Sequence, residues 1–250
     1  MCNIINRLFG RWSLVRRIGN GRFSYAGPYR GGFARYAYVE TPAGRVYDGP
    51  FVYSGGVSGG RHRAFLGIGG GSVVSLRGRY EHGRKVGRWR YERRGHGYWR
   101  RLTAVYAGGR LDGVATYEGR GNSYGIGNGN RMVKLSLTIR GDKPEGQLVG
   151  HFNGSPFRGQ FDADGYPDGL WTYGSASHKC TLVDYERWEH GALRESYSFD
   201  VSTGHRRDRS ERLLAMVRDI IDNECLPLVN SIKHNAAVWN GEIKVRKPGA

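Results

Sequence analysis

The chain has 250 residues, a formal net charge of +17 and 41 glycines, well above the average glycine use of about 7 %. No apolar run approaches the roughly 18 residues of a membrane span, and a hydrophobic content of 38 % is too high for a wholly disordered chain. The three cysteines are too scattered for a disulfide framework or a paired metal site, and residues 1–9 lack the apolar core of a signal peptide. The sequence therefore predicts a cytoplasmic protein.

Residues 1–18 are predicted to form an N-terminal cap. Ile4, Ile5, Leu8, Phe9 and Trp12 follow a short helical spacing. We therefore expect a helical segment that covers the first hairpin of the region that follows.

A repeat of aromatic residues and glycines runs through residues 19–117, the first predicted hairpin array. The segments Gly78–Tyr91 and Ala104–Tyr117 align at a constant offset of 26 residues. Weaker copies lie at Tyr25–Tyr29 and Tyr47–Tyr53. The coinciding positions are Tyr80 with Tyr106, Gly83 with Gly109, Gly87 with Gly113, and Tyr91 with Tyr117.

Each repeat has the features of a β-hairpin with one aromatic face. Trp89 and Tyr91 alternate with arginines, which is the period of a half-buried strand. Gly83 lies between the two strands, where a positive φ is needed, and at Gly87 we expect the missing side chain to admit a neighbouring ring or backbone. Because a lone hairpin is marginally stable, the hairpins are expected to stack into an elongated antiparallel array.

The pattern resembles the MORN repeat family, and more closely its degenerate bacterial variants with a Gly-x-Trp-x-Tyr strand. The resemblance is clearest over Gly78–Tyr117 and Gly159–Tyr173. The second glycine of the family's final Gly-x-Gly pair is replaced here by Trp89 and by Ala115. The resemblance implies a mainly β fold and a non-catalytic scaffold or adaptor that positions partner proteins or binds acidic surfaces, in some members phosphoinositide-rich membranes.

A Gly/Asn-rich loop is predicted at residues 118–131, followed by a second hairpin array at 132–204. The second array includes a third clear copy of the repeat, Arg158–Tyr173, and an alternating strand at Met132–Ile139.

Residues 205–250 are predicted to hold a C-terminal helix and a basic tail. Ser210 is the expected N-cap, Leu213–Ile221 provide an apolar helical face that would cover the array, and Pro227 is expected to end or kink the helix.

The sequence contains no nucleotide-binding loop and no catalytic or metal-binding motif, so we expect neither an enzyme nor a cofactor. Two alternatives remain open. His178, Cys180 and Asp184 could form a nucleophile cluster. Three aspartates of one hairpin could bind a cation, although solvated turn residues are the favoured interpretation; they are Asp162, Asp164 and Asp168.

The strongest functional signal is the density of basic residues between positions 77 and 101. This segment holds ten basic residues against only Glu81 and Glu92, and 32 of the 39 basic residues of the whole chain are Arg. Strand alternation would place Arg79, Arg88 and Arg90 opposite the core aromatics. The predicted anion- or partner-binding residues are Arg77, Arg79, Arg84, Lys85, Arg88, Arg90, Arg93, Arg94, Arg100 and Arg101.

Three kinds of partner fit such a basic face. The leading hypothesis is an acidic protein surface. The alternatives are a nucleic-acid backbone, with Tyr98 and Trp99 available for base stacking, and an anionic membrane surface. An ordinary solvated basic face is the interpretation that requires no partner.

Overall fold

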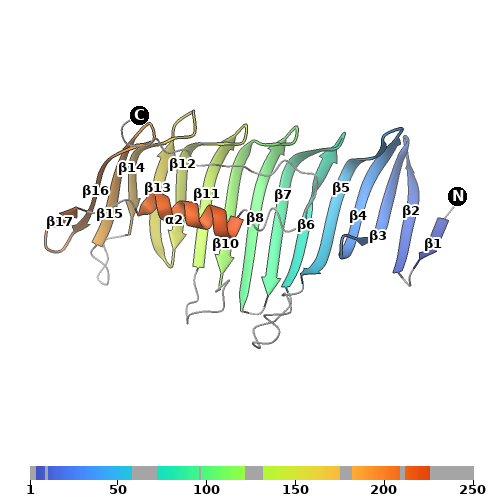
Figure 1. The fold of residues 1–250 in the computed structure, drawn as a ribbon, viewed down its shortest axis with the longest axis horizontal. Helices are drawn as coiled ribbons and strands as arrows, with labels where there is room; N and C mark the ends of the chain where they lie inside the picture. Colours follow the sequence, from blue (N-terminus) through green and yellow to red (C-terminus); the bar gives the residue numbers. More distant parts are fainter. Residues whose placement is uncertain are drawn as a thin grey trace.

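Each hairpin carries its aromatic residues on one face and cannot bury them alone. The hairpins bury these rings together by pairing side by side in one sheet. The computed structural model describes residues 4–8, 11–57, 72–95, 97–121, 132–174, 182–208 and 212–225. They form a 17-stranded sheet with a short helical segment on one face (Figure 1). None of the helices in these ranges is long and apolar enough to cross a membrane.

The strands are β1 (Ile4–Leu8), β2 (Arg11–Gly19), β3 (Arg22–Tyr29), β4 (Gly32–Thr41), β5 (Gly44–Val57), β6 (Ser72–Glu81), β7 (Arg84–Gly95), β8 (Tyr98–Ala107), β9 (Arg110–Leu111), β10 (Gly113–Arg120), β11 (Met132–Arg140), β12 (Lys143–Phe152), β13 (Ser155–Phe161), β14 (Pro167–Tyr173), β15 (Leu182–Glu189), β16 (Ala192–Asp200) and β17 (His205–Asp208). The helical segment consists of α2 (Leu213–Ile220) and one π-helical turn, η1 (Ile221–Cys225).

The strands lie across the sheet in sequence order. Each strand from β1 to β8 pairs antiparallel with the next, β8 pairs with both β9 and β10, and the order continues from β10 to β17. The predicted mainly β array of hairpins with a C-terminal helix is therefore confirmed. Because β10 pairs directly with β11, the sheet is continuous past residues 122–131, which lie outside the described residues.

The predicted helical cap at the N-terminus is wrong, because β1 and β2 are strands. Ile4 pairs with Val15, and Leu8 pairs with Arg11. β2 then pairs with β3 through Val15 and Tyr25. Ile4 and Ile5 are β-branched and favour strands, and the open edge of β3 offers backbone partners that a local helical spacing does not reveal.

The hydrophobic core lies on one face of the sheet and is built largely from aromatic rings. Phe51, Trp89 and Trp171 are almost completely buried there. Tyr80 meets Trp89 edge-on with ring centres 4.9 Å apart, and Tyr47 stacks on Tyr80 at 5.1 Å. Each such pair adds about 0.5–1.5 kcal/mol beyond area burial, so neighbouring hairpins are bound to one another through their rings.

Two glycines of the repeat Gly78–Tyr91 have separate structural roles. Gly87 has φ +64° at a bulge where the register shifts between Arg77 and Arg79, and no heavy atom lies within 4 Å of the position of a Cβ there. The close approach expected at Gly87 is therefore wrong. It occurs instead at Gly78, where a Cβ would lie 2.2 Å from Cδ2 of Trp89. Gly159 lies against Trp171 in the same way.

Hairpin turns are tied to the preceding hairpin. The Gly83 N–H donates to the carbonyl of Tyr47 at 2.8 Å, and the His82 N–H donates to the Asp48 carboxylate at 3.4 Å. The same pair of bonds recurs between β14 and the turn that follows β15. These bonds give each repeat backbone contacts with its neighbour in addition to the strand pairing.

The helix α2 lies across the core face of the sheet and contacts β14 and β15 (Figure 1). Leu213, Leu214, Val217 and Ile220 are buried in the same hydrophobic cluster as the strand residues. The predicted apolar face is therefore present. The N-cap residue is Arg212 and not Ser210, which lies outside the described residues, as does Pro227.

The start of α2 is capped from the sheet and not from its own sequence. The Glu186 carboxylate, on β15, accepts the N–H groups of Arg212 at 2.5 Å, Leu213 at 2.7 Å and Leu214 at 3.4 Å. It also accepts Nε1 of Trp188 at 3.1 Å. These donors satisfy a carboxylate that is only 1 % exposed, and its charge complements the positive end of the helix.

Glu186→Ala is expected to lower the free energy of unfolding by about 2–3 kcal/mol, because it leaves several buried N–H donors without an acceptor. Urea denaturation measures the loss, and amide exchange at Leu213 and Leu214 should accelerate. Glu189→Ala, at an exposed position of the same strand, is the control and should change stability by less than about 0.5 kcal/mol. Equal losses in the two variants would contradict the anchoring role.

Gly78→Ala is expected to cost about 1–3 kcal/mol of stability, because the new Cβ collides with the Trp89 ring. Gly56→Ala is the matched control, since Gly56 also lies in a strand and has no heavy atom within 4 Å of a Cβ. Thermal denaturation of both variants checks this. A Gly78→Ala protein as stable as Gly56→Ala would show that the packing of the Trp89 ring does not require glycine at position 78.

Candidate anion-binding face

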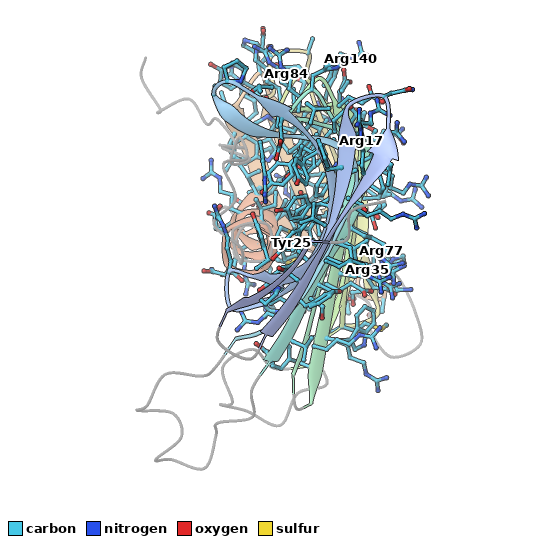
Figure 2. The ribbon with its side chains drawn as sticks, turned by 90° about the vertical axis from the view of Figure 1, so that its right-hand side faces the viewer. Arg17, Tyr25, Arg35, Arg77, Arg84 and Arg140 are labelled. Carbon is cyan, nitrogen blue, oxygen red and sulfur yellow. The ribbon has the colours of Figure 1, made fainter. Side chains whose placement is uncertain are left out.

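The sheet face opposite α2 carries most of the predicted basic residues. Strand alternation places one residue in two on this side, which we call the open face. Arg35 and Arg77 project from it, while α2 lies on the other side of the sheet (Figure 2). The arginine face is the part of the open face formed by Arg35, Arg77, Arg79, Arg88, Arg90, Arg94 and Arg101.

The strand register aligns several of these arginines in one row across the sheet. Arg35 is opposite Val52, Val52 is opposite Arg77, and Arg77 is opposite Arg90. The row continues into Thr103 on β8. Since neighbouring strands lie about 4.8 Å apart, the row forms a band of positive charge along the long axis of the sheet.

Glu92 lies within the arginine face and organises part of it. Its Oε1 accepts Nη2 of Arg90 at 2.6 Å and Nε of Arg101 at 2.7 Å, and Nη2 of Arg94 lies 4.0 Å away. Partial burial alone would raise the pKa of Glu92, but the hydrogen bonds from Arg90 and Arg101 outweigh it and lower the pKa. Glu92 therefore stays ionised and holds two guanidinium groups in fixed positions.

Four of the ten predicted residues do not join this face. Arg84 lies at the start of β7, beside the hairpin turn. Lys85, Arg93 and Arg100 point to the core side: Lys85 and Arg100 are buried, and Nε of Arg93 donates to Ser72 Oγ at 3.0 Å. The signal was in the sequence, because Lys85 and Arg93 share strand parity with Trp89.

Sequence reasoning also missed Arg35, which belongs to the arginine face. It alternates with Ala34 and Tyr36, both buried, so the same period-two rule would have placed it outward. Its position in the same row as Arg77 depends on the pairing of β4 with β5 and of β5 with β6.

Lys85 has an unusual environment for an amine. Its Nζ lies 4.7 Å from the ring centre of Trp89, 5.1 Å from that of Tyr91 and 5.0 Å from that of Tyr106. It donates to Tyr91 Oη at 2.7 Å, and Tyr91 Oη lies 3.1 Å from Tyr106 Oη. Burial lowers the pKa of Lys85 to about 8, while the aromatic faces attract the charged form.

The two aromatic residues considered for base stacking are separated by the sheet. Tyr98 is on the core side, where its ring fills the space above Gly95. Trp99 is opposite Arg94 and Arg120, which places it on the open face. Its ring is half-buried, and the guanidinium carbon of Arg101 lies 5.6 Å from its centre.

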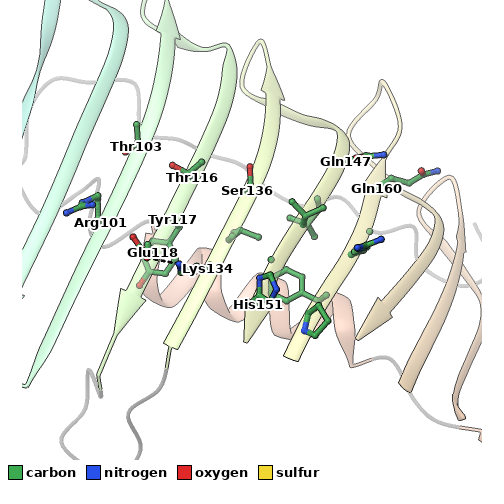
Figure 3. Close-up of a pocket in the computed structure, with 18 of the residues that line it drawn as sticks. Arg101, Thr103, Thr116, Tyr117, Glu118, Lys134, Ser136, Gln147, His151 and Gln160 are labelled. Atoms are coloured by element: carbon green, nitrogen blue, oxygen red, sulfur yellow. Dashed lines mark ion pairs between the residues drawn. The ribbon is translucent and has the colours of Figure 1, made fainter. Parts of the chain in front are cut away.

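A shallow groove continues the open face beyond the arginines, over β8 to β14 (Figure 3). Arg101 marks one end, and α2 lies behind the sheet in this view. Glu118 and Lys134 form an ion pair at 3.2 Å within the groove. The other polar side chains that line it are Thr103, Thr116, Ser136, Gln147, His151, Arg158 and Gln160.

The alternative cation site gains no support. Asp162 Oδ1 accepts the N–H groups of Asp164 and Tyr166, and Asp168 accepts the N–H of His190, so turn formation uses these carboxylates. His178 and Cys180 lie outside the described residues. Among the residues that the structure describes, no group of three His, Cys, Asp or Glu side chains is placed to hold a metal ion.

No protein-family model, curated protein or solved structure matches the chain. The resemblance to MORN repeats therefore stays a prediction.

Lys85→Met is expected to raise the free energy of unfolding at pH 7 by about 1–3 kcal/mol, since burying the ammonium costs about 1.4 kcal/mol per unit of lowered pKa and the aromatic contacts offset part of this. The folded pKa is about 8, against 10.5 for the free side chain. Below pH 8 both states hold the proton and the full cost applies.

As the pH rises from 8 to 10.5, the folded state releases the proton before the unfolded state does, so the cost disappears. Urea denaturation at pH 7 and pH 10 should show the advantage of Lys85→Met shrinking toward zero. An advantage that does not change with pH would contradict a buried charged amine.

Proposed function

We propose that this chain is a non-catalytic binding protein whose arginine face binds an acidic partner surface. The observation that carries the proposal is the one-sided core. Because the core aromatic residues pack on one face, the alternate positions remain on the open face, and the arginine face comprises seven arginines at such positions. Glu92 and Glu118 are the acidic residues interleaved with them in the register of β7 to β10.

The chemistry of the side chain supports an oxyanion-bearing partner. Guanidinium groups bind carboxylates and phosphates in a bidentate geometry and stay charged at every physiological pH. A second copy of the same face is a poor partner, because the two sets of arginines would repel each other.

The arrangement also fits a scaffold. Side-by-side hairpins with backbone ties between them form an extended surface whose length grows with each repeat. We further propose that the protein acts in the cytoplasm, a location that the three scattered cysteines support.

The test compares two triple variants with the same change in charge. Replacing Arg35, Arg77 and Arg88 with Gln removes three exposed charges of the arginine face. Replacing Arg84, Arg110 and Arg207 removes three exposed charges from elsewhere on the sheet. The probe is labelled poly-L-glutamate, and the measurement is fluorescence anisotropy at low salt.

Loss of the three arginine-face charges is expected to weaken binding about tenfold, because each exposed ion pair contributes roughly 0.5 kcal/mol to the binding free energy. The control variant should bind within about twofold of the wild type. Equal losses in the two variants, or no binding of poly-L-glutamate by the wild type at low salt, would overturn the proposal.

A further inference from the structure

Within the arginine face, Glu92 and its guanidinium partners form an arrangement that isolated surface arginines do not have. A single carboxylate oxygen accepts Nε of Arg101, and Nε and Nη2 of Arg90. The Glu92 side chain is only 14 % exposed, whereas those of Arg90 and Arg101 are 38 % and 34 % exposed. The accepting carboxylate of Glu92 therefore lies below the surface, whereas the guanidinium groups of Arg90 and Arg101 reach the surface.

This geometry leaves donors for a second oxyanion. Arg101 gives only its Nε to Glu92, and none of the hydrogen bonds of the described residues uses its two terminal nitrogens. Arg77 is opposite Arg90, and Arg94 is 68 % exposed on the same strand as Glu92. Fixing a guanidinium in advance reduces the side-chain entropy that binding would otherwise remove.

An aromatic surface adjoins this cluster. Trp99 lies between Arg94 and Arg120 in one row of the open face, next to the row that holds Glu92 and Arg101. The Arg101 guanidinium lies within 5.6 Å of the Trp99 ring centre. A half-buried indole beside a fixed guanidinium provides a flat π surface next to an oxyanion site.

We propose that this cluster, made of Arg90, Glu92, Trp99 and Arg101, is a binding site for single-stranded nucleic acid. The guanidinium groups bind the phosphates and an unstacked base packs on Trp99 or on Arg101. An acidic peptide has phosphate-like charge but no ring for this surface, and a duplex keeps its bases in its own stack. The inference rests on the proposed anion-binding function and adds the class of ligand.

The groove next to Arg101 offers a path for further nucleotides. It crosses the strands from β8 to β14, and Lys134, His151 and Arg158 lie along it (Figure 3). Its hydroxyl and amide groups can hydrogen-bond to sugars and base edges. A strand of several nucleotides bound at the cluster would therefore continue over polar surface.

In this site Glu92 is a positioning residue, and one substitution separates this role from simple electrostatics. Glu92→Gln makes the protein more positive, so binding by unorganised charge alone would become tighter. If Glu92 fixes the arginines, the same substitution should instead weaken binding of a single-stranded oligothymidylate about fivefold. Glu81→Gln is the matched control, because Glu81 is an exposed ion-pair partner of Arg79 on the neighbouring strand.

Trp99 is tested in parallel. Trp99→Leu is expected to weaken oligothymidylate binding about tenfold, the range for loss of one stacked base, and to leave poly-L-glutamate binding unchanged. Trp99→Phe keeps a ring at this position and should recover most of the affinity. Anisotropy titrations with both probes and with a duplex of the same length give the measurements, and circular dichroism checks the fold of each variant.

The outcomes separate the two proposals. The nucleic-acid site is overturned if Glu92→Gln binds oligothymidylate as tightly as Glu81→Gln, if the Trp99 variants bind it like the wild type, or if the duplex binds better than the single strand. Binding of poly-L-glutamate without binding of oligothymidylate would overturn this site and leave the proposed function standing. Binding of neither probe would overturn both.

Discussion

The burial of aromatic residues on a single face is the constraint on which the rest of this structure depends. A hairpin in isolation cannot keep its rings from water, so each hairpin pairs with the next and their rings meet edge-on and in stacks. The contact of Tyr80 with Trp89, and the absence of a side chain at Gly78, are local consequences of that requirement. The alternate residues of the strands then lie on the open face, and this chain uses arginine for many of them.

Polar groups that fall on the core side are accommodated in two different ways. Glu186 is surrounded by backbone N–H donors at the start of α2, so its burial attaches the helix to the sheet. Lys85 is surrounded by ring faces and one hydroxyl group, which satisfy it less completely. The first arrangement stabilises the fold, and the second makes its stability depend on pH.

The same periodicity that builds the core spaces the charges of the open face. Residues in register on neighbouring strands repeat about every 4.8 Å, so a strand sequence becomes a row of groups when the sheet forms. Glu92 then differs from the other acidic residues of this face, because the register brings Arg101 from the next strand to a carboxylate that Arg90 already contacts. A dense charge pattern becomes an ordered cluster in this way.

The sequence by itself determined the hairpin repeats, the aromatic core face and the outward position of Arg79, Arg88 and Arg90, because these follow from alternation within one strand. Alternation also predicts the burial of Lys85. It does not predict the strands at the N-terminus, because these depend on the free edge of β3. Only the tertiary structure decided that Arg35 aligns with Arg77, that Glu92 joins two arginines, and that Glu186 caps a helix 26 residues away. The reason is physical: these contacts depend on strand register and on bulges, and both are fixed when distant segments pair.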